Sequence, residues 1–181
     1  MIEQNQIKIK VYLDHCLLFL PHKIKNLTEK EDKSLEILFN NSSKFEYYTS
    51  KKTEREIKKL EGVGRGYLLF WYEFIQKALE KNIIESMPTT FNSAMFNAIA
   101  FNESIVEEED ILFTNLKQIF TEDDAEHIFQ AEKNNLDYFL TRDKKTILKP
   151  ARKNREQLKK INLKIRFVSP GELVQELSLN L

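Results

Sequence analysis

The chain has 181 residues, 28 basic and 28 acidic side chains, and a hydrophobic fraction of 41% that includes 13 Phe. This length favours one domain with a sizeable core, and the aromatic content excludes a disordered chain. The single cysteine, Cys16, excludes an intramolecular disulfide and disfavours a thiolate zinc site. No run approaches the roughly 18 apolar residues of a membrane span. The first residues lack an apolar signal core, so we expect a cytoplasmic protein with no membrane partner.

Charge is distributed unevenly along the chain, although its formal sum is zero. Residues 144–160 contain eight Lys or Arg and one Glu, whereas residues 103–126 contain nine acids and one Lys. Segregation of this kind produces one basic and one acidic face. For either run taken alone, a solvated helix surface is the simpler explanation.

The pattern of apolar residues predicts alternating strands and helices. Strands are expected where apolar or aromatic residues run or alternate over short lengths, at residues 7–13, 45–49, 136–140 and 163–168. Helices are expected where apolar residues recur at helical spacing, at residues 27–40, after Ser50, and at 67–79, 92–101, 106–120, 121–133, 150–160 and after Ser169. This order favours an α/β fold, a three-layer α/β/α sandwich with a central parallel sheet. We expect a single domain over residues 1–181, with an extra helical segment at about 80–120 and a loop at 87–90.

Four acidic residues stand out by their positions. Asp14 and Asp143 directly follow predicted strands, whereas Glu56 and Asp124 lie in the first turns of predicted helices. Strand ends and helix starts meet at one rim of a parallel sheet, where open α/β sheets bind ligands. Carboxylates gathered there repel one another unless a cation lies between them, and oxygen ligands suit Mg²⁺ or Mn²⁺.

Each acid also has an ordinary explanation. A charged residue after a strand often begins a loop, and first-turn acids stabilise helices. Asp124 is distinguished because it shares a helix face with His127 and Ile128, at offsets of three and four, whereas Asp123 is turned about 100° away. The glycine-rich residues 62–66 follow a helix and lack dinucleotide-binding spacing, so we expect a turn there.

Taken together, these segments resemble the PIN-domain family. The quoted motifs are a strand ending in YLD, the helix start SKKTERE, the segment DAEHIFQAEKNNLDYFLTRD and the closing strand IRFVSPGEL, which span residues from about 7 to 175. The chain departs from the family pattern where His15 and Cys16 replace the usual small hydroxyl residue and Asn after Asp14. It is also longer than the compact toxin members.

The resemblance implies a metal-dependent ribonuclease that hydrolyses RNA phosphodiester bonds. It implies Asp14, Glu56, Asp124 and Asp143 as the acidic cluster. Our hypothesis is that Asp14 and Asp143 are the main ligands of Mg²⁺ or Mn²⁺, with Asp124 as a ligand directly or through water. Glu56 is then the group that orients or deprotonates water, and Thr141 is a hydrogen-bonding residue behind the ligands. Many members are toxins of toxin–antitoxin pairs, so a protein antitoxin is an expected partner. RNA and a second copy of the chain are the other expected partners. The basic segment suggests RNA backbone contacts by Lys144, Lys145, Arg152 and Arg155.

Two other functions remain open at this point. The first is a PIN-like module that binds RNA or a protein without cutting it. The second is a phosphotransfer enzyme with Asp14 as its nucleophile. Dehalogenase-type phosphatases carry a second Asp two residues after the nucleophile, and the presence of Cys16 at that position disfavours this function.

Overall fold

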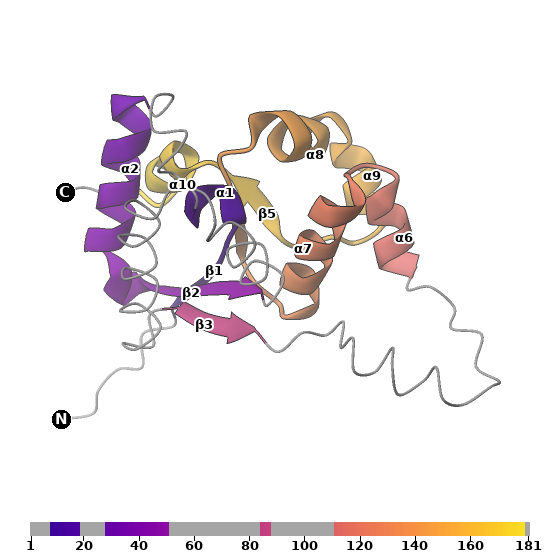
Figure 1. Cartoon of the computed structure of the whole chain (residues 1–181), viewed down its shortest axis with the longest axis horizontal. Coiled ribbons are helices and arrows are strands. Elements are labelled where there is room, and N and C mark those ends of the chain that lie inside the picture. The colour runs from indigo at the N-terminus through magenta and orange to yellow at the C-terminus, as the bar shows by residue number, and fades with distance from the viewer. Residues whose placement is uncertain (1–7, 19–27, 51–83, 88–110, 180–181) are drawn as a thin grey trace, which may run out of the picture.

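The computed structural model describes residues 8–18, 28–50, 84–87 and 111–179 (Figure 1). The strands are β1 (Ile9–Leu13), β2 (Phe45–Ser50), β3 (Ile84–Met87), β4 (Tyr138–Leu140) and β5 (Arg166–Val168). The helices are α1 (His15–Leu18), α2 (Glu29–Asn40), α6 (Ile111–Lys117), α7 (Glu122–Lys133), α8 (Lys149–Lys153), α9 (Arg155–Lys160) and α10 (Pro170–Glu176), with a 3₁₀ turn η3 (Ser42–Lys44) and a π-helical turn η4 (Lys144–Leu148).

The described strands form one sheet in the order β3-β2-β1-β4-β5, and every neighbouring pair is parallel. Tyr12 at the centre of the sheet pairs with Tyr48 of β2 and with Phe139 of β4. All carboxyl ends therefore lie at one edge, which we call the carboxyl edge. The residues that follow β1 and β4 are neighbours there although more than a hundred residues separate them in the sequence.

The central strands β1, β2 and β4 are largely buried, as expected of a parallel sheet covered by helices. Val11 and Leu13 point into one apolar cluster, which includes Leu35 and Leu38 of α2 and Leu173 of α10. On the other face, Tyr12 and Phe139 belong to a second cluster. Its remaining members include Phe113, Leu116, Ala125, Ile128, Ile147 and Leu158, from α6, α7, η4 and α9.

The two faces of the sheet are covered by different parts of the chain. Figure 1 shows α2 and α10 on one side of the sheet and α6 to α9 on the other. The α/β class and the parallel sheet predicted from the sequence are confirmed, and the arrangement is compatible with a three-layer α/β/α sandwich.

Three details differ from the sequence predictions. Residues 84–87 form an edge strand, where no strand was predicted and where a helical segment and the start of a loop were expected. The helix predicted at 150–160 is divided at Asn154, whose side-chain amide donates to the carbonyl of Pro150 at 2.9 Å. Asn side chains compete with the helical backbone in this way, which explains the break. The chain before it, at 144–148, forms a π-helical turn that was not predicted.

The predicted helices at 67–79 and 92–101, and the one that carries Glu56, lie outside the described residues. Within the described part of the chain, no helix combines the length and hydropathy needed to span a bilayer.

Candidate functional site

The strand order places a topological switch point at the centre of the carboxyl edge. From β1 the chain moves outward to β2 and β3, and it then returns to the other side of β1 to form β4 and β5. Connections therefore leave β1 and β4 in opposite directions, and open α/β sheets bind ligands outside such a point. Asp14 directly follows β1, and Thr141 to Asp143 directly follow β4.

Asp14 is buried, with only 1% of its surface exposed, and its carboxylate is held by hydrogen bonds. Oδ2 accepts from the Thr141 hydroxyl at 2.5 Å and from the Cys16 thiol at 3.0 Å. The Asp14 backbone N–H donates to the carbonyl of Leu140 at 3.1 Å and so extends the pairing of β1 with β4 by one residue. A charged group is tolerated at this depth only when it is hydrogen-bonded or paired.

Thr141 links the two strand-end acids. Its fully buried hydroxyl donates to Asp14 and accepts from the backbone N–H of Asp143 at 2.9 Å. Its own N–H donates to the carbonyl of Val168 in β5 at 3.0 Å. One side chain therefore sets the positions of Asp14 and Asp143 relative to each other.

Asp143 caps the π-helical turn η4. Its Oδ1 accepts from the backbone N–H groups of Lys145 at 2.8 Å and Thr146 at 2.7 Å. Both of these bonds fall on one oxygen, so they orient the carboxylate without using Oδ2. An acid that caps a helical turn is ordinary, but here the cap is the third residue after β4, at the switch point.

Asp124 lies in the first turn of α7, which begins after the N-cap residue Thr121. The Thr121 hydroxyl donates to Asp124 Oδ2 at 2.7 Å and accepts from the Asp124 N–H at 3.2 Å. Asp124 is 8% exposed, whereas Asp123 is exposed, which confirms the helix face inferred from the sequence.

Cys16 contributes a neutral thiol to this group. Burial, and after it the negative charge of Asp14, raises the pKa of Cys16 well above its ordinary value. The thiol therefore stays protonated and donates to Asp14, while its sulfur accepts from the backbone N–H of Arg142 at 3.2 Å. This arrangement does not favour Cys16 as a nucleophile or as a thiolate ligand.

Glu31 joins α2 to the residues around Asp143. It closes a capping box with Thr28 and lies 3.6 Å from Arg142 and 3.2 Å from Lys144. Burial alone would raise the pKa of Glu31, but the Thr28 hydrogen bonds and the cations Lys144 and Arg142 outweigh it and hold the pKa below 4.5. The Nε atom of Arg142 has no hydrogen-bond partner among the described residues.

A second buried polar group lies beneath the carboxyl edge. The Tyr12 hydroxyl of β1 lies 2.6 Å from Nδ1 of His127 in α7 and donates to Ser50 Oγ of β2 at 3.0 Å. Ser50 Oγ is 3.3 Å from the same nitrogen. Sequence reasoning missed this triad, because it treated Ser50 as a helix cap and His127 only as a marker of a helix face. Polar residues occupy buried positions of these three elements, but the sequence does not show which of them meet.

The donor chemistry of the strand-end acids fits a hard divalent cation, since carboxylate oxygens are the ligands that Mg²⁺ and Mn²⁺ prefer. Among the residues that the structure describes, no group of three or more His, Cys, Asp and Glu side chains is arranged to hold a metal ion. Glu56, the fourth predicted acid, lies outside those residues. The Thr141 hydroxyl connects the Asp14 carboxylate to the backbone of Asp143, and Asp124 lies at the start of α7.

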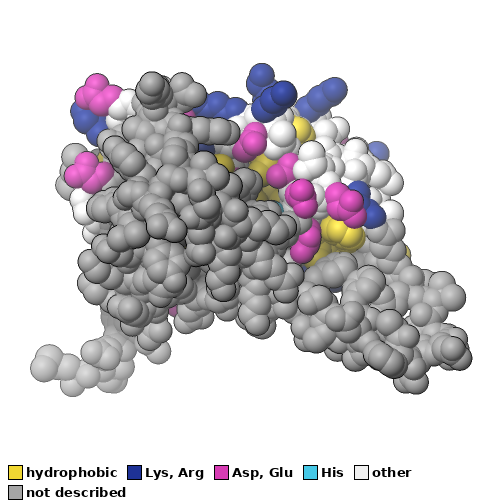
Figure 2. Space-filling model, viewed as in Figure 1, with side chains coloured by type: hydrophobic (Ala, Val, Ile, Leu, Met, Phe, Trp, Pro, Cys, Tyr) yellow, Lys and Arg dark blue, Asp and Glu magenta, His cyan; other side chains and the backbone are white. Residues whose placement is uncertain are grey.

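Basic side chains follow the candidate site directly. The four predicted RNA contacts are all exposed, but Lys144 pairs with Glu31 and Arg152 pairs with Glu172. Lys145 and Arg155 have no ion pair within the described ranges. Figure 2 shows Lys and Arg side chains gathered over the region of α8, next to a group of acidic side chains.

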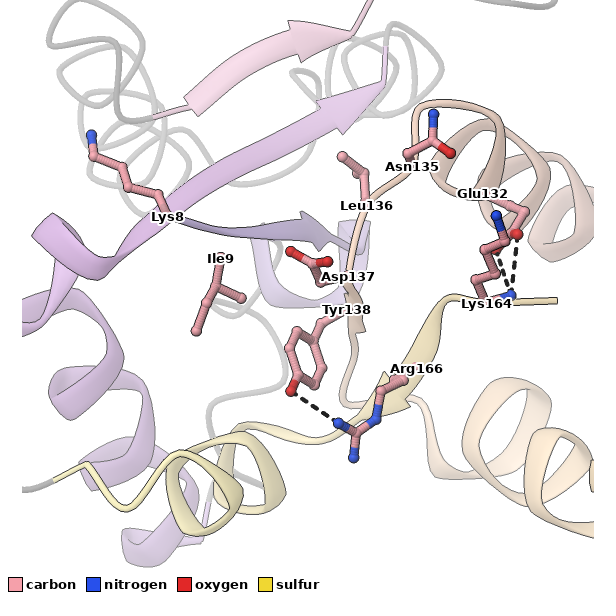
Figure 3. A pocket seen from close by; sticks show the side chains of 9 residues that line it. All are labelled: Lys8, Ile9, Glu132, Asn135, Leu136, Asp137, Tyr138, Lys164 and Arg166. Atoms are coloured by element: carbon pink, nitrogen blue, oxygen red, sulfur yellow. Dashed lines mark hydrogen bonds between the residues drawn. The ribbon is translucent and has the colours of Figure 1, made fainter. Parts of the chain in front are cut away.

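A separate pocket of about 490 Å³ lies at the opposite, amino-terminal edge of the sheet (Figure 3). Its two acids are held by backbone groups. Glu132 accepts from the N–H groups of Lys164 and Ile165, and Asp137 accepts from the N–H of Lys10 at 2.8 Å. Both carboxylates therefore serve the chain itself, and the pocket is a weaker candidate than the carboxyl edge.

Comparison with known proteins does not assign the chain to a family. No protein-family model matches it, and no curated protein matches it.

Proposed function

We propose that this protein is a PIN-like, metal-dependent ribonuclease that hydrolyses RNA at the carboxyl edge of its sheet. The observation that carries the proposal is the Asp14–Thr141–Asp143 arrangement, in which one buried hydroxyl donates to the Asp14 carboxylate and accepts from the backbone N–H of Asp143 at the switch point. Such a point is where open α/β sheets bind their ligands. The motifs that resemble the PIN family fall on these same residues.

The roles that we propose follow from the surroundings of each residue. Asp14 and Asp143 hold Mg²⁺ or Mn²⁺, and Asp124 joins them directly or through water. Thr141 and Cys16 orient Asp14 by donating to Oδ2, and fixing a ligand in this way typically matters about 10-fold to 100-fold for metal affinity or activity. Glu56 orients or deprotonates the attacking water. The bound cation supplies charge stabilisation and a lowered pKa of water.

The basic residues after Asp143 supply the RNA-binding surface in this proposal. Lys145 and Arg155 are exposed and have no ion pair within the described part of the chain, so they are available to phosphates. Arg152 pairs with Glu172 at the surface, and exposed ion pairs of this kind contribute about 0–1 kcal/mol. Lys144 is exposed, but its partner Glu31 is largely buried and also lies near Arg142, so Lys144 is less available to phosphates. Contacts of this kind position RNA without reading its sequence.

A second candidate is a PIN-like module that binds RNA or a protein partner without cutting it. It is favoured by the lack of a group of three metal-binding side chains in the described residues. A toxin role, with a protein antitoxin as its partner, is a narrower form of the main proposal. A small DNA-binding protein encoded beside this gene would support it.

The test is cleavage of single-stranded RNA by purified protein after chelation and stepwise return of Mg²⁺ or Mn²⁺. We expect cleavage that depends on the cation and is lost in Asp14→Asn, which keeps an oxygen to accept from Thr141. RNA binding without cleavage at any cation concentration would support the second candidate. Equal cleavage by the wild type and Asp14→Asn would rule out the proposed site.

A further inference from the structure

Three buried polar side chains join the helix that carries Asp124 to the two central strands. Tyr12 comes from β1, Ser50 ends β2, and His127 lies on α7. All three are at most 1% exposed. Their polar atoms form a closed triangle of 2.6 Å, 3.0 Å and 3.3 Å. Buried polar networks of this kind are stable only when every member is satisfied, so they strongly constrain how the joined elements pack.

The triangle joins the two elements that present proposed metal ligands. Tyr12 lies on β1, two residues before Asp14, which directly follows that strand. His127 is three residues after Asp124 on α7, so those two side chains share a helix face. The contact between Tyr12 and His127 therefore connects the elements that present Asp14 and Asp124, two residues before Asp14 and three residues after Asp124.

Apolar packing alone leaves the position of α7 less well specified. Ile128, Ala125 and Ala131 of α7 pack in the apolar cluster on this face of the sheet. Apolar contacts are not directional and tolerate small sliding of one element along another. A hydrogen bond of 2.6 Å has a narrow distance and angle, and it therefore fixes the helix along the strand direction.

We propose that the Tyr12–Ser50–His127 triangle is a positioning device that sets Asp124 against Asp14. The proposal rests on the proposed function, because it assigns the triangle to the metal site. His127 is a positioning residue in this scheme. It acts through α7 and not by touching the cation or the RNA.

The test compares two Tyr→Phe variants that each remove one buried hydroxyl. Tyr12→Phe removes the hydroxyl of the triangle and keeps the ring, which stacks on Phe139 at 4.9 Å between centroids. Tyr47→Phe is the matched control. Its hydroxyl donates to the carbonyl of Leu38 at 3.0 Å, and its ring lies in the apolar cluster on the other face of the sheet.

Two measurements distinguish positioning from general stability. The first is amide hydrogen exchange in the metal-free protein at Ala125, whose N–H donates to the carbonyl of Thr121 at 2.8 Å in the first turn of α7. The second is Mn²⁺ affinity by calorimetry. For Tyr12→Phe we expect faster exchange at Ala125 than in Tyr47→Phe at equal global stability, and Mn²⁺ binding weakened about tenfold. Tyr47→Phe should leave both measurements near the wild-type values.

The conservative variant His127→Asn should keep part of the Mn²⁺ affinity, because the Asn side-chain amide lies near the position of the His127 Nδ1 atom. His127→Leu has no polar atom there and should lose that affinity. The nitrogen chemical shifts of His127 should also change in Tyr12→Phe.

If exchange at Ala125 and Mn²⁺ affinity are the same in Tyr12→Phe and Tyr47→Phe, the triangle is structural only and the inference is wrong. If the wild type itself does not bind Mn²⁺, the proposed function fails, and the exchange data alone then decide whether the triangle positions α7. Ser50→Ala serves the same comparison if Tyr12→Phe does not fold.

Discussion

The hydroxyl of Thr141 donates to Oδ2 of Asp14 across 2.5 Å, although 127 residues separate the two in the sequence. The same oxygen of Thr141 accepts from the backbone of Asp143. A single buried hydroxyl thus organises the point at which the connections from β1 and β4 diverge. This relationship leads to the first prediction.

Thr141→Val keeps the shape of the side chain and removes both hydrogen bonds. We expect RNA cleavage to fall about 10-fold to 100-fold, because Asp14 loses the donor that orients it. Stability should fall by about 1–3 kcal/mol, since the half-buried Asp143 N–H and the buried Asp14 carboxylate each lose a partner. Cleavage rates and urea unfolding measure the two effects. Thr141→Ser is the control and should keep most of the activity; equal activity in the Val and Ser variants would show that the hydroxyl has no role.

The second prediction concerns the acids of α7 and η4. Asp124→Asn and Asp143→Asn should each abolish metal-dependent cleavage while the fold survives, because Asn retains an oxygen that can accept from Thr121 or from the N–H groups of η4. In the proposed site the carboxylates repel one another without the cation, so removing one of them should leave the metal-free protein as stable as before or more so.

Asp123→Asn is the matched control for these variants, because Asp123 is exposed on the same helix turn. It should retain nearly full activity. Circular dichroism and cleavage assays on the three variants measure these outcomes. An equal loss of activity in Asp123→Asn and Asp124→Asn would mean that cleavage does not depend on the acid on the buried face of α7.

The third prediction separates exposed cations by their partners. The double variant Lys145→Gln with Arg155→Gln should weaken RNA binding for all sequences. The slope of the logarithm of the binding constant against the logarithm of the salt concentration should become shallower by about 0.7 for each lost contact on a single strand. Lys144→Gln with Arg152→Gln removes the same charge but takes it from residues that already pair with Glu31 and Glu172. We expect a smaller change of slope for this pair. Fluorescence anisotropy at several salt concentrations makes the comparison, and an unaltered slope in both double variants would place the RNA path elsewhere.

Glu31 provides a prediction about pH. Its pKa is held below 4.5 in the folded protein, so its contribution to stability is fully present above pH 4.5 and is lost as the pH falls through the lower, folded-state value. Glu31→Gln should therefore be less stable than the wild type at neutral pH, and the difference should shrink in acid. Unfolding midpoints from pH 7 down to pH 3 measure it. Glu36→Gln, at an exposed position on the same helix, is the control; a stability difference for Glu31→Gln that does not vary with pH would contradict the ion pairing described here.

The strand-end acids could be predicted from the sequence because their signal is local. Asp14 and Asp143 each follow a short apolar run, and in a parallel sheet such positions must meet at one edge. The burial of Asp124 was predicted for the same kind of reason, because its spacing from His127 and Ile128 fixes a helix face.

The details that were missed depend on tertiary contacts. Strand β3 is four residues long and is defined by its pairing with β2, which short-range periodicity does not show. The break at Asn154 depends on one side-chain hydrogen bond to Pro150. The contact between Tyr12 and His127 joins residues 115 positions apart. None of these features leaves a periodic trace in the sequence.

Binding of Mn²⁺ to the metal-free protein tests the central claim most directly, because it asks whether the acids at the carboxyl edge form one metal centre. Calorimetry on the wild type should show Mn²⁺ binding, and the same additions should raise the melting temperature, since a ligand that binds only the folded state stabilises it. In Asp14→Asn, both the heat of binding and the thermal shift should disappear while the fold is retained. Mn²⁺ binding of undiminished affinity in Asp14→Asn, or no binding by the wild type, would contradict a metal centre at Asp14.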